Sequence, residues 1–189
     1  ETGVKKIKVG HAGTLDPFAT GLLIVGIGRE ATKRLDEFKA LPKTYIATLK
    51  LGATSDTQDS AGVITKTQKH KNTKTPTENG VIDILHDFVG KQEQVPPMYS
   101  AKKIGGKKLY DLARKGIEIE RQPNEIEIYG IKLLDYVPSP LQGEGQGEVK
   151  IEVDCSTGTY IRTLAHDIGE KLGCGAYCDE LRRTMIGKY

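Results

Sequence analysis

Gly10-His11-Ala12-Gly13-Thr14-Leu15-Asp16-Pro17-Phe18-Ala19-Thr20-Gly21-Leu22-Leu23 is the stretch of this chain that is richest in conformationally special residues. Its glycines permit backbone conformations and close approaches that a Cβ atom would block. Pro17 pushes the residue before it toward an extended conformation and away from the helix. The stretch therefore predicts a rigid, irregular loop that presents the carboxylate of Asp16.

The segment that ends this loop and continues beyond it, residues 22–27, is almost entirely apolar and has the length of a strand. We expect it to form a buried strand that anchors the loop to the core. A carboxylate held on a rigid turn beside such a strand can serve as a catalytic group. It can equally cap backbone amides in a structural turn, because Asp-Pro is a common turn former. The residues alone leave both interpretations of Asp16 open.

A resemblance to a known family favours the catalytic interpretation. The loop, with residues 28–33 after it, is similar to the signature of the TruB family of tRNA pseudouridine synthases. Other segments resemble that family in the same order along nearly the whole chain: residues 43–45, 95–103, 106–110, 158–164 and 181–183. The resemblance implies an α+β pseudouridine synthase fold, with a mixed, largely antiparallel central sheet flanked by helices and loops.

The resemblance also implies roles for individual residues. Asp16 would be the catalytic residue, the ring of Tyr45 would stack on the target base, and Arg162 would pair with Asp16. Leu181 would form an apolar wall of the pocket. His11 would occupy the space that the flipped base leaves in the RNA.

Several further residues are candidates for contact with RNA. Lys33 lies on a short amphipathic helix predicted over residues 30–38, where it either faces solvent or contacts a phosphate. A second group surrounds two glycines and predicts an adaptable cationic surface: Lys102, Lys103, Lys107 and Lys108. This segment is either a solvated loop or, with two tyrosines beside it, a surface for an RNA backbone and its unstacked bases. Tyr160 is also counted among the RNA contacts.

The chemistry implied by the resemblance suits these residue types. Converting uridine to pseudouridine breaks a C–N glycosidic bond, turns the base and joins its carbon to the sugar, with no metal and no other cofactor. It needs an ionised carboxylate in a pocket dry enough to prevent hydrolysis. Burial alone raises the pKa of a carboxyl group, whereas a paired guanidinium such as that of Arg162 would keep Asp16 charged and oriented. Attack on the base, attack on the sugar and elimination all stay open as the role of Asp16.

We therefore expect an isomerase that converts the T-arm uridine of tRNA to pseudouridine and acts as a cytoplasmic monomer. Two alternatives remain. A hydrolase using Asp16 with another carboxylate would release free base or sugar, and a non-catalytic RNA-binding module would form no product. The presence of Asp16, Tyr45 and Arg162 together speaks against the second alternative. Residues 56–62 and 95–108 are more similar to the bacterial stand-alone enzymes than to the guide-RNA relatives.

The composition sets the bounds of this interpretation. A chain of 189 residues fits one domain, and its net charge of +3 is too small to establish a nucleic-acid partner. Cys155, Cys174 and Cys178 lack zinc-site spacing and predict reduced thiols in a cytosolic protein. No signal peptide and no apolar run of membrane-spanning length is present, so no membrane partner is expected. We expect residues 1–189 to be a catalytic domain, a fragment without the family's earlier strand and C-terminal PUA domain.

Periodicity predicts the remaining elements. Alternation predicts strands over residues 43–51, 125–131 and 149–155, and helical spacing predicts a helix over residues 159–172 with Arg162 near its beginning. Thr75, Pro76 and Glu78 form a capping box that would open another helix, which Gly90 would close. The polar residues 55–62 lack the ligand pattern of a calcium loop, so we expect a structural turn there.

Overall fold

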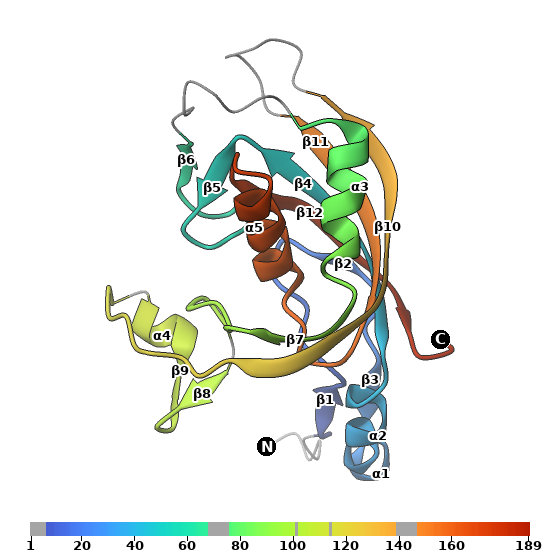
Figure 1. Cartoon of the computed structure of the whole chain (residues 1–189). Coiled ribbons are helices and arrows are strands. Elements are labelled where there is room, and N and C mark those ends of the chain that lie inside the picture. The colour runs from blue at the N-terminus through green and yellow to red at the C-terminus, as the bar shows by residue number, and fades with distance from the viewer. Residues whose placement is uncertain (1–6, 68–75, 101, 114, 139–146) are drawn as a thin grey trace.

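The computed structural model describes residues 7–67, 76–100, 102–113, 115–138 and 147–189. Its centre is a six-stranded sheet in the order β2, β12, β4, β11, β10, β7 (Figure 1). In that order the strands are Thr20–Gly21, Ala176–Ile186, Lys43–Leu51, Glu148–Cys155, Asn124–Val137 and Gly90–Gln94. β2 and β12 run parallel, and the other neighbours run antiparallel. The α+β class and the mixed, largely antiparallel sheet that the resemblance implied are confirmed.

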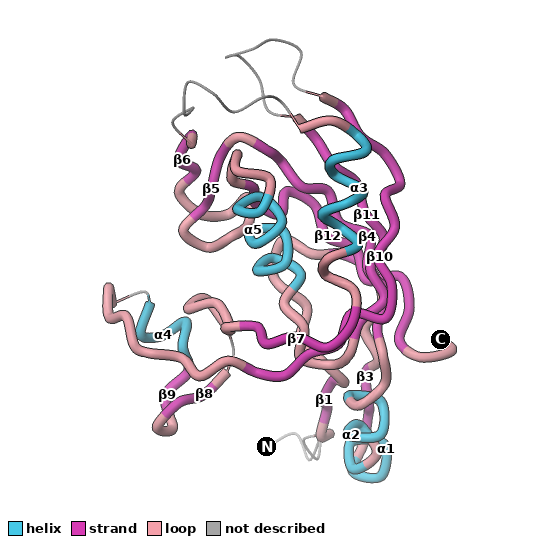
Figure 2. The backbone as a smooth tube through the Cα atoms, viewed as in Figure 1, coloured by secondary structure: helices cyan, strands magenta, loops and turns pink. Residues whose placement is uncertain are grey.

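In the described part of the chain, three two-stranded ribbons lie beside this sheet. They pair β1 (Val9–His11) with β3 (Val25–Ile27), β5 (Ala53–Ser55) with β6 (Ile64–Lys66), and β8 (Lys103–Ile104) with β9 (Lys107–Lys108). The β8–β9 ribbon and the short helix α4 (Leu109–Ala113) stand away from the two long helices, beyond the end of β7 (Figures 1 and 2). The basic segment of the sequence is thus an arm of the molecule.

The core lies between the sheet and two helices, α3 (Glu78–His86) and α5 (Ile161–Lys171), which pack on the same face (Figure 1). On β4, Ala47, Leu49 and Leu51 are buried because their side chains alternate toward this face. Helix α5 contributes a complementary apolar stripe that includes Leu164, Ala165 and Ile168. This packing fixes where α5 begins relative to β4 and β12, and the candidate site lies at that end of the helix. Among the described residues, no helix has the length and apolar character to cross a membrane.

The prediction of a buried strand over residues 22–27 is wrong. Strand β3 pairs only with β1 in a two-stranded ribbon, and its Val25 and Ile27 are 49% and 67% exposed. Gly26 is the residue that points inward, against Ala31 and Leu35. The Asp16 loop is anchored instead by β2, which joins the main sheet through β12. The apolar character of residues 22–27 therefore did not predict burial correctly, because alternate side chains of β3 face outward from the ribbon.

Two predicted helices also need correction. The helix expected over residues 30–38 is two short helices, α1 (Arg29–Lys33) and α2 (Leu35–Lys39). The N-cap of α3 is Thr77, whose side-chain oxygen accepts a hydrogen bond from the Gly80 N–H at 3.1 Å. The expected cap Thr75 lies outside the described residues. A second threonine two positions later thus provides the cap, because its hydroxyl meets the free amide of the first turn.

The central strand β12 was not predicted from the sequence. Its pairing with β4 shifts register between Cys178 and Glu180 and again between Arg183 and Met185. Each irregularity reverses which residues face the core, so no simple alternation runs through the strand. The strands predicted over residues 43–51, 125–131 and 149–155 and the helix over residues 159–172 are confirmed as β4, β10, β11 and α5, with shifted ends.

Candidate active site

Asp16 lies in the irregular loop between β1 and β2, where the sequence placed it. The Ala19 N–H donates a hydrogen bond to the Asp16 carbonyl oxygen at 3.0 Å and closes a turn around Pro17. At the far end of the loop, the Leu22 N–H donates to the carbonyl oxygen of Arg183 at 2.8 Å. The Asp16 side chain is 32% exposed, so its carboxylate is held on a fixed turn without being sealed from solvent.

Arg162 faces this carboxylate from the first turn of α5. Its Nε donates to Asp16 Oδ2 at 2.8 Å and its Nη2 donates to Asp16 Oδ1 at 3.1 Å. The Arg162 side chain is only 2% exposed. Two parallel contacts between a planar guanidinium and a carboxylate fix both groups in one orientation. The pair that the resemblance implied is therefore present in the geometry.

A second carboxylate, that of Asp59, also faces the guanidinium. Arg162 Nη1 lies 3.3 Å from Asp59 Oδ2, and the remaining guanidinium hydrogens are directed to the carbonyl oxygens of Thr57 at 2.8 Å and Tyr99 at 2.9 Å. Asp59 Oδ1 accepts hydrogen bonds from the Thr57 hydroxyl at 2.6 Å and from the Ala61 N–H at 3.0 Å. The buried cation is thus shared between two carboxylates and two carbonyls, which offsets the cost of its burial.

Residues 55–62 form the polar turn that the sequence predicted. The turn also makes contacts with α5 and β12. Gln58, at φ 64°, accepts a hydrogen bond on its side-chain oxygen from the Thr163 hydroxyl at 2.8 Å. The Gln58 carbonyl accepts from the Cys178 N–H at 3.0 Å, which joins the turn to β12. Sequence reasoning missed the contact of Asp59 with Arg162. Its only signal was one acidic side chain in a polar turn, and that pattern is not specific.

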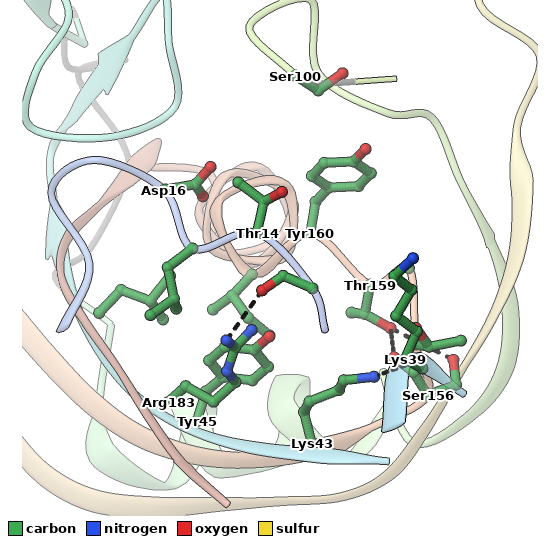
Figure 3. A pocket seen from close by; sticks show the side chains of 16 residues that line it. Thr14, Asp16, Lys39, Lys43, Tyr45, Ser100, Ser156, Thr159, Tyr160 and Arg183 are labelled. Atoms are coloured by element: carbon green, nitrogen blue, oxygen red, sulfur yellow. Dashed lines mark hydrogen bonds between the residues drawn. The ribbon is translucent and has the colours of Figure 1, made fainter. Parts of the chain in front are cut away.

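A cavity of about 310 Å³ opens beside Asp16 (Figure 3). Its size is at the lower end of the range for small-molecule and cofactor sites. It is lined by residues from the Asp16 loop, from β4 and β12, and from the segment that leads into α5: Gly13, Thr14, Leu15, Asp16, Lys39, Lys43, Tyr45, Ser100, Ser156, Thr157, Gly158, Thr159, Tyr160, Ile161, Leu181 and Arg183. The structure therefore brings Asp16, Tyr45, Tyr160 and Leu181 to one cavity, with Arg162 directly behind Asp16.

Tyr45 and Arg183 lie side by side in this cavity, below Thr14 and Asp16 in the view of Figure 3. Burial raises the pKa of the Tyr45 hydroxyl, and the neighbouring Arg183 guanidinium opposes part of that rise. Burial also lowers the pKa of Lys43, and the positive charge of Arg183 lowers it further. The Lys43 ammonium donates to the carbonyl oxygens of Lys39 at 2.5 Å and Leu41 at 2.6 Å. This side of the cavity is therefore positively charged, and two backbone carbonyls hold the Lys43 ammonium in place.

Other predicted contact residues lie away from the cavity lining. His11 is on β1 and is exposed, paired across the ribbon with Val25. Lys33 is exposed on α1, and its ammonium lies 2.9 Å from a Glu30 carboxylate oxygen. Both can meet RNA only outside the cavity. The structure does not bring either of them to Asp16.

The basic arm is described only in part. The Lys102 ammonium donates to the side-chain oxygen of Asn124 at 2.6 Å. The backbones of Lys103, Lys107 and Lys108 form the β8–β9 ribbon, and their side chains lie outside what the structure describes. Four lysines of the sequence are thus grouped at one arm, adjoining the segment that carries Tyr99 and Ser100.

The arrangement suits general acid–base or nucleophilic chemistry by one oriented carboxylate. Within the described residues, no group of histidine, cysteine and acidic side chains is arranged to hold a metal ion. Cys155, Cys174 and Cys178 are free thiols there, and burial raises the pKa of each of them. An aromatic ring, Tyr45, and an apolar side chain, Leu181, thus share one cavity with the Asp16 carboxylate.

Solved structures share this fold. The chain matches the crystal structure of a Cbf5-Nop10-Gar1 complex with a TM-score of 0.63 and 29% identity, over 94% of this chain and 40% of that one. It matches a structure of an H/ACA RNP bound to a substrate RNA containing 2′-deoxyuridine with a TM-score of 0.60 and 27% identity, over 95% and 39%. The fold and the site together define a protein of the pseudouridine synthase class.

The particular family follows from the sequence matches. Residues 2–161 match the model for the N-terminal domain of the TruB family pseudouridylate synthases, and residues 162–189 match the tRNA pseudouridylate synthase B C-terminal domain. The chain belongs to the TruB family. The sequence resemblance and the pseudouridine synthase fold that it implied are therefore confirmed.

Curated relatives named tRNA pseudouridine synthase B cover almost the whole chain. Identity is 50% over 98% of this chain for the protein of Clostridium acetobutylicum, 49% over 98% for that of Phocaeicola vulgatus, and 44% over 99% for that of Chlamydia abortus. The chain spans 61%, 74% and 73% of the lengths of these relatives. It is thus similar to the larger part of each of them.

The boundary between the two matched regions, after residue 161, does not divide the structure. It falls at the start of α5, between Ile161 and the buried Arg162. Strand β12 belongs to the second region, yet it lies between β2 and β4 of the first. The pair of Asp16 and Arg162 therefore joins the two regions within one sheet-and-helix unit.

Proposed function

We propose that this chain isomerises uridine to pseudouridine in the T arm of tRNA. The observation that carries the proposal is the fixed ion pair of Asp16 and Arg162 at the wall of a cavity that also presents Tyr45 and Leu181. Membership of the TruB family and the names of the relatives support the reaction and the tRNA substrate.

The geometry suggests a division of labour among these side chains. Asp16 acts on the target nucleotide while its C–N bond breaks and the new C–C bond forms, and Arg162 holds it ionised and oriented. The ring of Tyr45 stacks on the flipped base, and Leu181 closes the other side. Keeping the detached base in a small cavity allows it to turn and rejoin without loss to solvent. The ring carbon that joins the sugar loses its proton and the freed ring nitrogen gains one, so the product has the same mass as the substrate.

RNA binding in this proposal is electrostatic and follows the shape of the tRNA T arm. Lysines at 102, 103, 107 and 108 contact phosphates, Lys33 and His11 add contacts outside the cavity, and Tyr160 adds one at the cavity wall. One monomer binds one T arm. Removing one phosphate contact should flatten the slope of log affinity against log salt by roughly 0.7 for single-stranded segments. Replacing two of the four lysines by glutamine tests this: an unchanged affinity and slope would place the RNA surface elsewhere.

We further propose that residues 1–189 form a single catalytic unit. The location of β12 within the main sheet supports this unit, because removing the second matched region would open the sheet between β2 and β4. Limited proteolysis checks it. A stable fragment that ends near residue 161 would contradict a single unit.

The test of function uses a T-arm hairpin RNA and the whole chain. Pseudouridine-specific chemical mapping should detect product at the T-arm uridine with the wild-type protein and none with Asp16→Asn. The matched control is Asp83→Asn, which removes an exposed carboxylate from α3 and should leave the yield unchanged. Release of free uracil would favour a hydrolase. Hairpin binding without any modification would favour a non-catalytic RNA-binding module.

A further inference from the structure

Arg183 is a second buried arginine at the site, and its side chain contacts both ends of the loop that carries Asp16. Its Nε donates to the carbonyl oxygen of Leu22 at 2.8 Å, and its Nη2 donates to the carbonyl oxygen of Gly13 at 3.2 Å. Its own carbonyl accepts from the Leu22 N–H at 2.8 Å. Only 2% of the residue is exposed. One side chain thus closes the loop before and after the catalytic turn.

The charge of Arg183 is not balanced in the way that the charge of Arg162 is. Arg162 faces the carboxylates of Asp16 and Asp59, whereas no ion pair joins Arg183 to a carboxylate in the part of the chain that the structure describes. The nearby cation Lys43 adds to the positive charge. Burying a cation without an anion is costly unless backbone carbonyls take its hydrogen bonds. Hydrogen bonds to the carbonyl oxygens of the loop therefore stabilise the buried guanidinium.

The same residue also adjoins Tyr45. β12 places Arg183 opposite Tyr45 in the register with β4, and opposite Gly21 in the register with β2. The guanidinium lies close enough to the Tyr45 hydroxyl to oppose the effect of burial on it. A Cβ atom at Gly21 would come within 2.1 Å of the Arg183 carbonyl oxygen, so β2 is packed directly on the arginine backbone.

We propose that Arg183 is a positioning residue that sets the distance between the Asp16 carboxylate and the ring of Tyr45. This inference rests on the proposed function, because the distance matters only if both groups act on one nucleotide. A guanidinium can reach two separate carbonyls with a planar fork, and an ammonium cannot reproduce that fork. A loop tied only by its backbone would let Asp16 shift, and a misplacement of the order of 1 Å lowers a rate by about 100-fold.

The experiment compares Arg183→Met and Arg183→Lys with the matched control Arg182→Met. Arg182 is the preceding residue of the same strand and is exposed, so its loss changes the charge of the chain equally without touching the loop. Arg183→Met should lower the single-turnover rate on the hairpin by about 100-fold. Hairpin affinity of the folded protein should be unchanged. The single-turnover rate of Arg183→Lys should lie between those of Arg183→Met and wild type. Arg182→Met should turn over like wild type.

Two further readouts separate positioning from a merely structural role. In Arg183→Met, amide hydrogen exchange of residues 13–22 should become faster while exchange in α5 stays protected. In Arg183→Ala, added guanidinium at concentrations far below denaturing ones should restore part of the rate, since the ion can occupy the vacated fork. An alanine variant that is folded, fails to respond to guanidinium and exchanges like wild type would overturn the proposal.

Failure of this inference differs from failure of the proposed function. If wild type forms no pseudouridine, the proposed function fails, and the exchange of residues 13–22 still decides whether Arg183 holds the loop. If wild type is active and Arg183→Met is equally active, only the role of Arg183 is refuted. A loss of rate that merely follows the unfolded fraction, measured by circular dichroism on the same sample, also refutes it.

Discussion

Replacing Asp16 by asparagine tests the central ion pair, because it keeps the shape of the side chain and removes its charge. Two contacts to Arg162, at 2.8 and 3.1 Å, lose their anionic acceptor, although the donor stays charged. The asparagine oxygen can replace one of them, but its NH₂ group then faces a guanidinium hydrogen. Arg162 retains Asp59 at 3.3 Å and two carbonyl oxygens, so the buried cation is not left without an anion.

These contacts set the expected change in stability. A hydrogen bond to a charged group contributes about 1.5 to 3 kcal/mol, and removing one partner of a fully buried ion pair costs about 3 to 5 kcal/mol. The Asp16 side chain is 32% exposed and Asp59 remains, so solvent and the second carboxylate reduce the loss. We expect Asp16→Asn to lower the free energy of unfolding by about 1 to 3 kcal/mol. The protein should stay folded, bind the hairpin and form no pseudouridine.

A double-mutant cycle with Asp59→Asn makes the reasoning quantitative. Either single variant leaves Arg162 with one carboxylate, and the double variant leaves it with none. The double variant should therefore lose about 1 to 3 kcal/mol more than the two single losses together. Urea unfolding of all four proteins, followed by circular dichroism, measures this coupling. The same preparations are used for hairpin affinity and pseudouridine yield.

Three results would refute this account of the site. Strict additivity in the cycle would mean that the two carboxylates do not share the Arg162 charge. Loss of the folded state in Asp16→Asn alone would return Asp16 to a structural turn. Near-normal pseudouridine yield from Asp16→Asn would remove the carboxylate from the reaction.

Variants of Tyr45, Gly21 and Cys155 give further tests. Tyr45→Ala should weaken hairpin binding by about 1 to 3 kcal/mol while Tyr45→Phe retains affinity, because phenylalanine keeps the stacking face; equal affinities in a binding titration would make Tyr45 a packing residue only. Gly21 has φ +102°, and an added Cβ would lie 2.1 Å from the Arg183 carbonyl oxygen, so Gly21→Ala should lower the unfolding free energy by about 3 kcal/mol or more. Gly28→Ala, which meets no atom within 4 Å, should cost less in the same urea titration. Burial raises the pKa of the Cys155 thiol from 9.0 to about 11, so the folded protein keeps a proton that the unfolded chain loses. The contribution of this thiol to stability should therefore be fully present below pH 9 and be lost as pH rises through about 11, by roughly 3 kcal/mol in total, with a shallower fall in Cys155→Ala.

Local sequence determined the parts of the site that depend on a few neighbouring residues. The turn around Asp16 follows from Pro17 and from glycines that adopt backbone angles closed to other residues. The alternation of β4 placed Tyr45 on the same face as the buried Ala47 and Leu49. The resemblance then singled out the aspartate and its arginine, although no local pattern joined them.

Only the tertiary structure decided which distant segments meet. Asp16 and Arg162 are 146 residues apart in the sequence, and their contact depends on how α5 packs against the sheet. The contact of Asp59 with Arg162 depends on a turn docked to β12 at Cys178. Short-range periodicity predicts whether a segment is a helix or a strand, but it does not predict which element that segment packs against. These contacts could therefore not be predicted from it.

The same limit explains where the sequence misled. The apolar residues 22–27 were predicted to be buried, yet Val25 and Ile27 face outward from a ribbon, because burial depends on what packs over a strand. β12 has interrupted alternation, and the register shift between Cys178 and Glu180 turns Arg183 to the buried side, opposite Tyr45. The sequence by itself determined that a loop presents the Asp16 carboxylate, and it determined the family of the chain. The long-range pairing of β2, β4 and β12 decided which cations surround it, since burial and charge balance arise only when those strands meet.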